Sequence, residues 1–169
     1  SWQDILDRPK MADGAIIATQ DTMHVEPAVK ALEKGYHVLL EKPMALTLEN
    51  CNAIVDASKR TGLTLNICHV LRYIDFFWKV KSIIDSGIIG DVLTIYHAEN
   101  VSYYHMAHSY VRGNWHRSDI ASPMILAKCC HDLDLIQWFA GSRPRHISSM
   151  GNLSHFRPEN APEGAPGRC

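Results

Sequence analysis

The sequence predicts an α/β fold in residues 1–71, followed by a part of mixed α+β character in residues 72–169. Two observations predict the first part: short apolar runs alternate with segments of helical periodicity, and turn residues separate them. A third observation predicts the second part, because long extended segments replace the short apolar runs after Arg72. We therefore expect a parallel sheet with right-handed crossovers before residue 72.

The first part contains three short apolar runs that are typical of buried parallel strands. They cover residues 14–19, 36–40 and 63–68. Between the first two runs, apolar side chains recur at helical spacing from Val25 to Leu32, and Gly35 stands where a helix is expected to end. Between the last two runs, Thr47 begins a second helical pattern that Gly62 ends.

Residues able to bind a ligand follow each predicted strand. Ligands of parallel α/β sheets bind beyond the carboxyl ends of the strands. Residues 19–21, 41–43 and 68–72 all follow such ends. We therefore expect them to line one edge of the sheet.

The second part has a different pattern. Helices are predicted over residues 76–84 and 124–139, and Gly141 closes the second one. Residues 91–104 alternate in polarity and predict a long strand, and residues 146–156 predict another extended segment. This mixture predicts a sheet with one face covered by helices or solvent.

Composition and charge exclude several classes of protein. The 169 residues carry a net charge of −1, and the Lys and Arg residues are scattered among Asp and Glu, which is not typical of a nucleic-acid-binding protein. The apolar stretches are shorter than the ~20 residues of a membrane span. Five cysteines without regular spacing indicate reduced thiols. We therefore expect a cytoplasmic protein that binds neither nucleic acid nor membrane.

The tripeptide Glu41-Lys42-Pro43 directly follows a predicted strand, at the edge where ligands bind. A partly desolvated lysine at this place can exchange a proton near neutral pH or polarise a substrate oxygen. The proline fixes the local backbone and so aims the side chains. The alternative is an ordinary surface ion pair at a strand end.

A second candidate cluster lies in residues 128–134. His131 and Asp134 are three residues apart on a predicted helix, so the carboxylate can orient an imidazole that works as a general base. The alternatives are a structural histidine and cysteines that pack in a core. The His and Cys residues between positions 105 and 131 lack the spacing of a zinc motif, so no metal site is predicted.

The combination and order of these segments resemble the Gfo/Idh/MocA family (glucose-fructose oxidoreductase, inositol dehydrogenase and rhizopine catabolism protein). The resemblance covers nearly the whole chain and rests on residues 15–19, His24, residues 28–32, 35–38 and 41–43, Arg72, residues 87–92, Trp115 and residues 131–135. It implies an oxidoreductase that transfers hydride between NAD or NADP and a hydroxyl-bearing carbon of a sugar, sugar acid or cyclitol. It also implies a homo-oligomer.

The resemblance assigns cofactor-binding roles. Lys42 is similar to the lysine that contacts both nicotinamide and substrate, Glu41 to the residue on the nicotinamide ribose, and Pro43 to a proline that often follows a cis peptide. Thr19 and His24 match the segment beside the cofactor.

The resemblance also assigns residues of the second part. His131 matches the catalytic histidine. Arg72 matches the arginine that enters the second domain, and we count it among the cofactor-binding candidates. Many members have an aspartate four residues before the histidine, where this chain has Ala127, followed by Lys128. We therefore count Lys128 as a candidate catalytic residue, a cation that would suit an anionic substrate such as a sugar acid.

The chain has no Gly-x-Gly-x-x-Gly loop for a pyrophosphate. By the resemblance, residues 1–71 are the later portion of a Rossmann domain, and residues 72–169 are the first portion of a C-terminal substrate and oligomerisation domain with a mainly antiparallel sheet. We expect a fragment that binds NAD(P)H weakly or not at all. The alternative is a non-catalytic module that binds or assembles through an exposed sheet edge.

Overall fold

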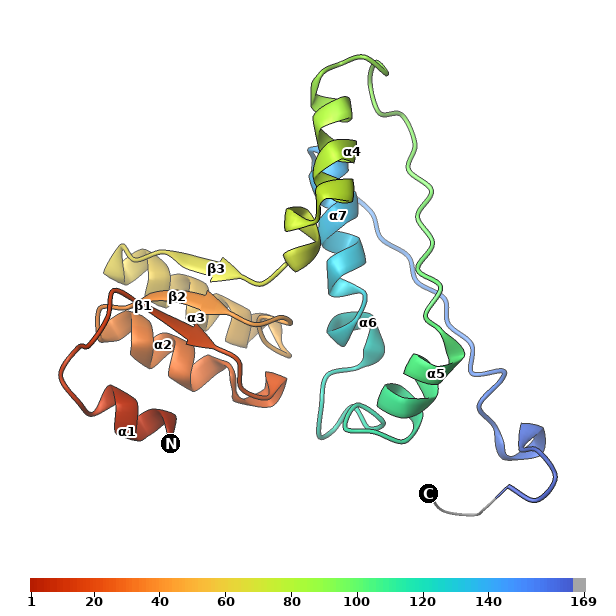
Figure 1. Ribbon diagram of the computed structural model, residues 1–169, viewed down its shortest axis with the longest axis horizontal. Coiled ribbons are helices and arrows are strands. Elements are labelled where there is room, and N and C mark those ends of the chain that lie inside the picture. Colours follow the sequence, from red (N-terminus) through yellow and green to blue (C-terminus); the bar gives the residue numbers. More distant parts are fainter. Residues whose placement is uncertain (166–169) are drawn as a thin grey trace.

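The computed structural model describes residues 1–165, which form two parts of different construction (Figure 1). The first part contains the sheet and the helices that pack on it. The second part is a column of helices, flanked by long segments without regular secondary structure. Cys169 and the predicted end of the second part lie outside the described residues.

The first part contains the predicted parallel sheet. Its strands are β1 (Gly14–Ile17), β2 (His37–Leu40) and β3 (Leu65–Ile67), in the order β1-β2-β3. Ile17 pairs with Leu40, and Leu40 pairs with Ile67, so the carboxyl ends of the three strands are level. The prediction of a parallel α/β arrangement is therefore confirmed, and the segments that follow the strands share one edge.

Two helices cover one face of the sheet, α2 (Val25–Glu33) and α3 (Leu48–Thr61) (Figure 1). Thr47 caps α3 by accepting a hydrogen bond from the backbone N–H of Asn50, and Gly62 ends it with φ at 70°. Leu32, Leu40 and Ile54 are completely buried between the sheet and these helices. This core fixes the strand ends from which the candidate site is built.

Three short elements complete the first part. Helix α1 (Trp2–Leu6), which the sequence pattern did not predict, has a capping box between Ser1 and Asp4 and packs against α2. The 3-10 turn η1 (Asp21–Met23) follows β1, and η2 (Val70–Tyr73) follows β3. Both turns lie just beyond the carboxyl ends of strands, and η2 leads into the second part.

The second part is built on three helices, α4 (Asp75–Asp85), α6 (Met124–Ala127) and α7 (Cys130–Ala140). The remaining elements are short: α5 (Tyr103–His105), the π-helical turn η3 (Met106–Val111) and the 3-10 turn η4 (Pro158–Asn160). Helices α4 and α7 contact each other, and Trp78 stacks on Trp138 with ring centroids 5.9 Å apart. No helix of the described residues is long and apolar enough to cross a membrane.

The sheet that was predicted for the second part is absent. Between residues 68 and 165 the structure contains no strand, and residues 91–100 and 146–154 have no regular secondary structure. Alternating polarity gives a segment two different faces, but a strand also needs a neighbour that accepts and donates its backbone hydrogen bonds. Neither segment has such a neighbour in the described part of the chain, so the predictions of a strand at 91–104 and of a mainly antiparallel sheet are wrong.

The single helix predicted over residues 124–139 is divided into α6 and α7. In an unbroken helix the N–H of His131 would bond to the carbonyl of Ala127. Here it bonds to the carbonyl of Lys128 instead, at 3.4 Å. The interruption leaves the Ala127 carbonyl free of the helical ladder, and a side chain from the first part uses it.

Candidate functional site

A cavity of about 240 Å³ lies where the two parts meet, at the carboxyl ends of β1 and β2. The first part lines it with the segments that follow these strands, and the second part contributes Trp115 and Ala127. The lining residues are Ala18, Thr19, Gln20, Asp21, Glu41, Lys42, Pro43, Trp115 and Ala127. Four predicted site residues, Thr19, Glu41, Lys42 and Pro43, are therefore together in one cavity.

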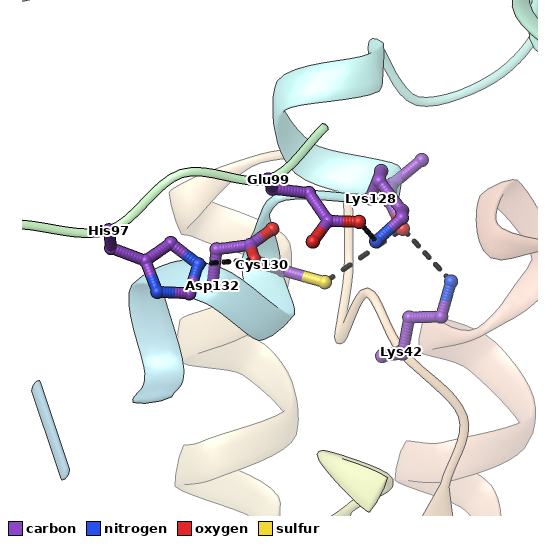
Figure 2. A network of polar contacts seen from close by, with 7 residues as sticks. Lys42, His97, Glu99, Lys128, Cys130 and Asp132 are labelled. Carbon is purple, nitrogen blue, oxygen red and sulfur yellow. Dashed lines mark hydrogen bonds and ion pairs between the residues drawn. The ribbon is translucent and has the colours of Figure 1, made fainter. Parts of the chain in front are cut away.

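The side chain of Lys42 connects the cavity to the second part. Its Nζ donates a hydrogen bond of 2.9 Å to the carbonyl of Ala127 (Figure 2). The acceptor is a main-chain carbonyl that the break between α6 and α7 frees from the helical ladder. The Lys42–Pro43 peptide is cis.

His131 lies in the first turn of α7, only 9% exposed. Within the described residues its Nδ1 is buried without a hydrogen-bond partner. Burial lowers the pKa of His131, and the charges of Lys42 and Lys128 lower it further. The imidazole is therefore neutral near pH 7 and can accept a proton.

Asp134 does not orient His131, contrary to the expectation from their spacing. Both of its carboxylate oxygens accept hydrogen bonds from Arg72, from Nε and Nη2 at 2.7 Å each. The Arg72 guanidinium also lies 5.4 Å from the centre of the Trp138 ring. Arg72 thus ties η2 to α7 and is absent from the cavity lining.

Lys128 is held by Glu99, which lies on the extended segment beside α6 and α7 (Figure 2). One helical turn further, His97 Nε2 and the Asp132 carboxylate lie 2.8 Å apart. Burial alone would lower the pKa of Lys128, but the hydrogen bond and the charge of Glu99 raise it above its usual value. Lys128 therefore remains a cation near neutral pH, already paired with a carboxylate.

His24 is buried behind the cavity, with 1% of its surface exposed. Its Nδ1 lies 2.8 Å from the carbonyl oxygen of Pro43, and its Nε2 lies 3.1 Å from that of Thr19. The two ring nitrogens thus contact the backbone of two residues that line the cavity. This geometry suits a residue that holds the walls together more than one that touches a ligand.

Asp21 connects the two parts at the wall of the cavity. Its Oδ2 accepts hydrogen bonds from the Trp115 indole N–H and the Ser122 backbone N–H, both at 3.2 Å, and from the Ser122 hydroxyl. Asp21 is 7% exposed and Ser122 is fully buried. This buried carboxylate places the Trp115 ring in the wall of the cavity.

Sequence reasoning missed two side chains of the site region, His69 and Glu99. His69 lies in the segment 68–72 that was expected to line the ligand edge, so its position after β3 was a usable signal. Glu99 was treated as one position of a predicted strand, and nothing in the sequence indicates that it meets Lys128.

The cysteines give no sign of a metal site. Burial raises the pKa of both Cys129 and Cys130, so they remain thiols near neutral pH. Among residues 1–165, no three His, Cys, Asp or Glu side chains gather as metal ligands would.

Comparison with known families gives two matches that follow each other along the chain. Residues 1–69 match the family described as "Oxidoreductase family, NAD-binding Rossmann fold". Residues 77–165 match the "GFO/IDH/MocA C-terminal domain".

Individual relatives support the same grouping. The chain is 31% identical to 2,7-anhydro-N-acetylneuraminate hydratase of Escherichia coli over 156 residues, which are 92% of this chain and 41% of that enzyme. Among solved structures it is similar to scyllo-inositol dehydrogenase from Lactobacillus casei with bound NAD(H) and scyllo-inositol, with 26% identity and a TM-score of 0.67, covering 83% of this chain and 41% of that one. It is also similar to the WlbA dehydrogenase from Bordetella pertussis in complex with NADH and UDP-GlcNAcA, with 27% identity and a TM-score of 0.63, over 82% of this chain and 40% of that one. The chain thus spans about two fifths of the length of these relatives.

Proposed function

Because the chain belongs to the Gfo/Idh/MocA family of oxidoreductases, we propose that it supplies the reacting groups of an NAD(P)-dependent dehydrogenase. The proposed reaction oxidises a hydroxyl-bearing carbon of a sugar, sugar acid or cyclitol, or reduces the corresponding ketone. One observation carries the proposal: Lys42 lines the cavity at the strand ends while its Nζ lies on Ala127, one turn before His131.

Lys42 is suited to stabilise charge on the substrate oxygen. An ammonium group has three N–H donors, and the Ala127 carbonyl occupies one of them. The other two can be directed at the oxygen that loses its proton during oxidation. A cation placed in this way lowers the barrier by several kcal/mol, because it stabilises charge that develops only in the transition state.

His131 is suited to take the hydroxyl proton. A general base must be unprotonated at the working pH and must lie near the reacting group. Burial and the two nearby lysines keep the His131 imidazole neutral, and its buried Nδ1 leaves hydrogen-bonding capacity unused within the described residues. When bound, the nicotinamide ring supplies the hydride acceptor.

The residues present fit the nicotinamide end of the cofactor. The cavity lies at the carboxyl ends of parallel strands, where α/β proteins bind nucleotides, and we propose that Thr19, Glu41, Lys42 and Pro43 hold the nicotinamide riboside there. His24 would keep the two walls in place through its contacts with Thr19 and Pro43. The glycine-rich motif for the pyrophosphate is not part of this sequence.

The test of this function uses the whole protein that carries this chain. NAD⁺ or NADP⁺ reduction is measured with myo-inositol, glucose and glucuronate, in the wild type and in Lys42→Met. We expect a loss of about 100-fold or more in turnover for Lys42→Met, because removing one donor that stabilises developing negative charge typically costs that much. Lys59→Met, on the exposed face of α3, is the matched control and should leave turnover unchanged. Equal rates for Lys42→Met and wild type would contradict the proposal.

Binding by the 169-residue chain is tested separately. We expect titration with NADH or NADPH, followed by nicotinamide fluorescence, to show weak binding or none, because the helix-terminus amides that bind a pyrophosphate are missing from its sequence pattern. Saturable tight binding would overturn the expectation of a cofactor-deficient chain. The alternative of an assembly module depended on a sheet edge in the second part, and the described residues contain no strand there.

A further inference from the structure

Two histidine rings meet at the junction between the two parts. His69 follows β3, and His131 lies in the first turn of α7. Their ring centroids are 5.9 Å apart and the ring planes are nearly perpendicular, at 85°. The backbone of His69 is fixed, because its N–H donates to the carbonyl of Ile67 and its carbonyl accepts from Arg72. The pair is therefore a built feature of the junction.

Each ring has one nitrogen without a partner. Within the described residues, the Nδ1 atoms of His69 and His131 are both buried and make no hydrogen bond. Leaving a buried polar atom unsatisfied costs about 1–3 kcal/mol, so such atoms are rare outside sites that bind a ligand or transfer a proton. Two such nitrogens on adjacent imidazoles indicate that the two rings act together in binding or proton transfer.

A proton taken up by His131 needs a way out. The ring is 9% exposed, and an imidazolium there would face the ammonium groups of Lys42 and Lys128, with Asp132 as the opposing charge. Asp134 cannot take the proton, because Arg72 bonds to both of its oxygens. The position one turn before His131 is an alanine, which offers no titratable group.

His69 is placed to receive that proton. The residue is partly buried, whereas His131 is buried. The charged groups that act on it are Asp134, Arg72 and Lys42. Burial lowers the pKa of His69, and Arg72 and Lys42 oppose Asp134, so the ring is neutral near pH 7 and can accept a proton and release it.

We propose that His69 is the proton-transfer partner of His131. This inference rests on the proposed dehydrogenase function. As the carbon is oxidised and its hydride reduces NAD(P)⁺, the O–H bond breaks and the proton binds to a nitrogen of His131. The imidazolium then passes this proton to His69, whose ring centroid lies 5.9 Å from that of His131. His69 releases a proton to solvent, which leaves both rings neutral for the next turnover.

The first test measures the coupling of the two rings in the full chain without cofactor or substrate. Histidine ring signals are followed by NMR across the acidic to alkaline range in the wild type and in His69→Asn. The asparagine amide can keep a hydrogen-bond donor near the position of Nδ1 but carries no titrating charge. We expect the titration midpoint of His131 to move to higher pH, because a neighbouring group that can become positive has been removed.

His146→Gln is the matched control for that measurement, since His146 is exposed and is not among the groups whose charge acts on His131. It should leave the midpoint of His131 unchanged. An unchanged midpoint in His69→Asn as well would overturn the proposal, because rings that do not sense each other's charge do not exchange a proton through a short path.

The second test measures turnover in the whole protein with myo-inositol as the probe. We expect His69→Ala to lower turnover about 10- to 100-fold with little change in KM, and added imidazole to restore part of it. The acid limb of the pH–rate profile should move in the same direction as the NMR midpoint. A wild-type rate in His69→Ala, or a loss that imidazole does not rescue, overturns the relay. If the wild type itself transfers no hydride, the proposed function fails and the relay with it, whereas the NMR coupling stands or falls independently.

Discussion

The two parts of the chain differ in how their regular structure is held in place. In the first part, three short parallel strands bond to each other and bury Leu32, Leu40 and Ile54 completely under two helices. In the second part, the extended residues 91–100 expose Leu93 and Tyr96 to 92% each. A helix closes its own hydrogen bonds, whereas a strand depends on a neighbour. The comparison shows that sequence pattern is sufficient only where the partners are also present.

The largest expected effect tests the closed core of the first part. Replacing Leu40 by alanine removes a fully buried side chain from the central strand and leaves a cavity between the sheet and its helices. We expect the free energy of unfolding to fall by about 3 kcal/mol, as measured by urea denaturation. Leu93→Ala is the matched control in the extended segment and should change it by less than about 0.5 kcal/mol.

Equal effects of these two substitutions would break the comparison. A large loss from Leu93→Ala would mean that Leu93 is buried in solution, either against another part of this chain or against a bound partner. A small loss from Leu40→Ala would mean that the parallel sheet is not the stable core.

The three strands and the helices α2 and α3 of the first part were predictable because each of them depends on local signals. Thr47 and Gly62 mark the two ends of α3, and the apolar runs mark the strands within one or two residues. The hydrogen bond that Lys42 donates to the Ala127 carbonyl at the break between α6 and α7 was not predictable, because the two residues are 85 positions apart. The same holds for the second part in general, where long-range contacts decide the local structure.

The second prediction concerns the contact between the two parts at Asp21. Replacing Asp21 by alanine leaves the N–H of Ser122 and the indole N–H of Trp115 without their acceptor. We expect the unfolding free energy to fall by about 2 kcal/mol, because buried donors lose their partner. The Trp115 fluorescence should also shift, since the ring loses the bond that fixes it in the cavity wall. An unaltered emission would show that the two parts are joined elsewhere.

The same contact has a defined pH dependence. Burial alone would raise the pKa of Asp21, but the hydrogen bonds from Ser122 and Trp115 outweigh it and hold the pKa below its ordinary value of 3.8. A carboxylate with a lowered pKa stabilises the fold above its unfolded pKa, and this contribution is lost as the pH falls through the folded value. We therefore expect the wild type to lose stability below about pH 4, and Asp21→Ala to show a smaller loss over that range.

The sequence was sufficient to predict most residues of the candidate site, but only some of the hydrogen bonds and ion pairs between them. Sequence position was enough to bring Lys42, Glu41 and Thr19 into one cavity, because the ends of parallel strands share an edge. The partners of Asp134 and Lys128 were not predictable from helix spacing. Arg72, which donates to Asp134, and Glu99, which accepts from Lys128, come from segments far away in sequence.

The third prediction is smaller and concerns the bridge between η2 and α7. Arg72→Lys keeps the charge but loses the planar fork that bonds both oxygens of Asp134. The pair is partly exposed, at 38% for the Arg72 side chain and 14% for that of Asp134, so solvent screening limits its contribution. We expect a loss of about 1 kcal/mol in urea denaturation, and Arg60→Lys on the exposed face of α3 as the control should cost less. Indistinguishable losses would mean that this bridge is no stronger than a surface ion pair.

The smallest effect on stability is expected for Glu99→Gln, and it tests what Lys128 is for. The pair is partly exposed, so the change should cost about 0.5 kcal/mol or less. The pKa of Lys128 is raised despite its burial because Glu99 bonds to it, so the contribution of the pair is present at neutral pH and is lost only as the pH rises through that pKa.

Removing the Glu99 carboxylate leaves the Lys128 cation available to another anion. If Lys128 recognises an acidic substrate, Glu99→Gln should lower the KM for glucuronate relative to glucose in the whole protein, and Lys128→Gln should abolish that difference. If Lys128 serves only to hold the extended segment against α7, both variants should change glucuronate and glucose kinetics equally. In that case the preference for an acidic substrate, which was inferred from the presence of Lys128 beside Ala127, fails. The roles proposed for Lys42 and His131 are unaffected, because neither requires Lys128 to be free of Glu99.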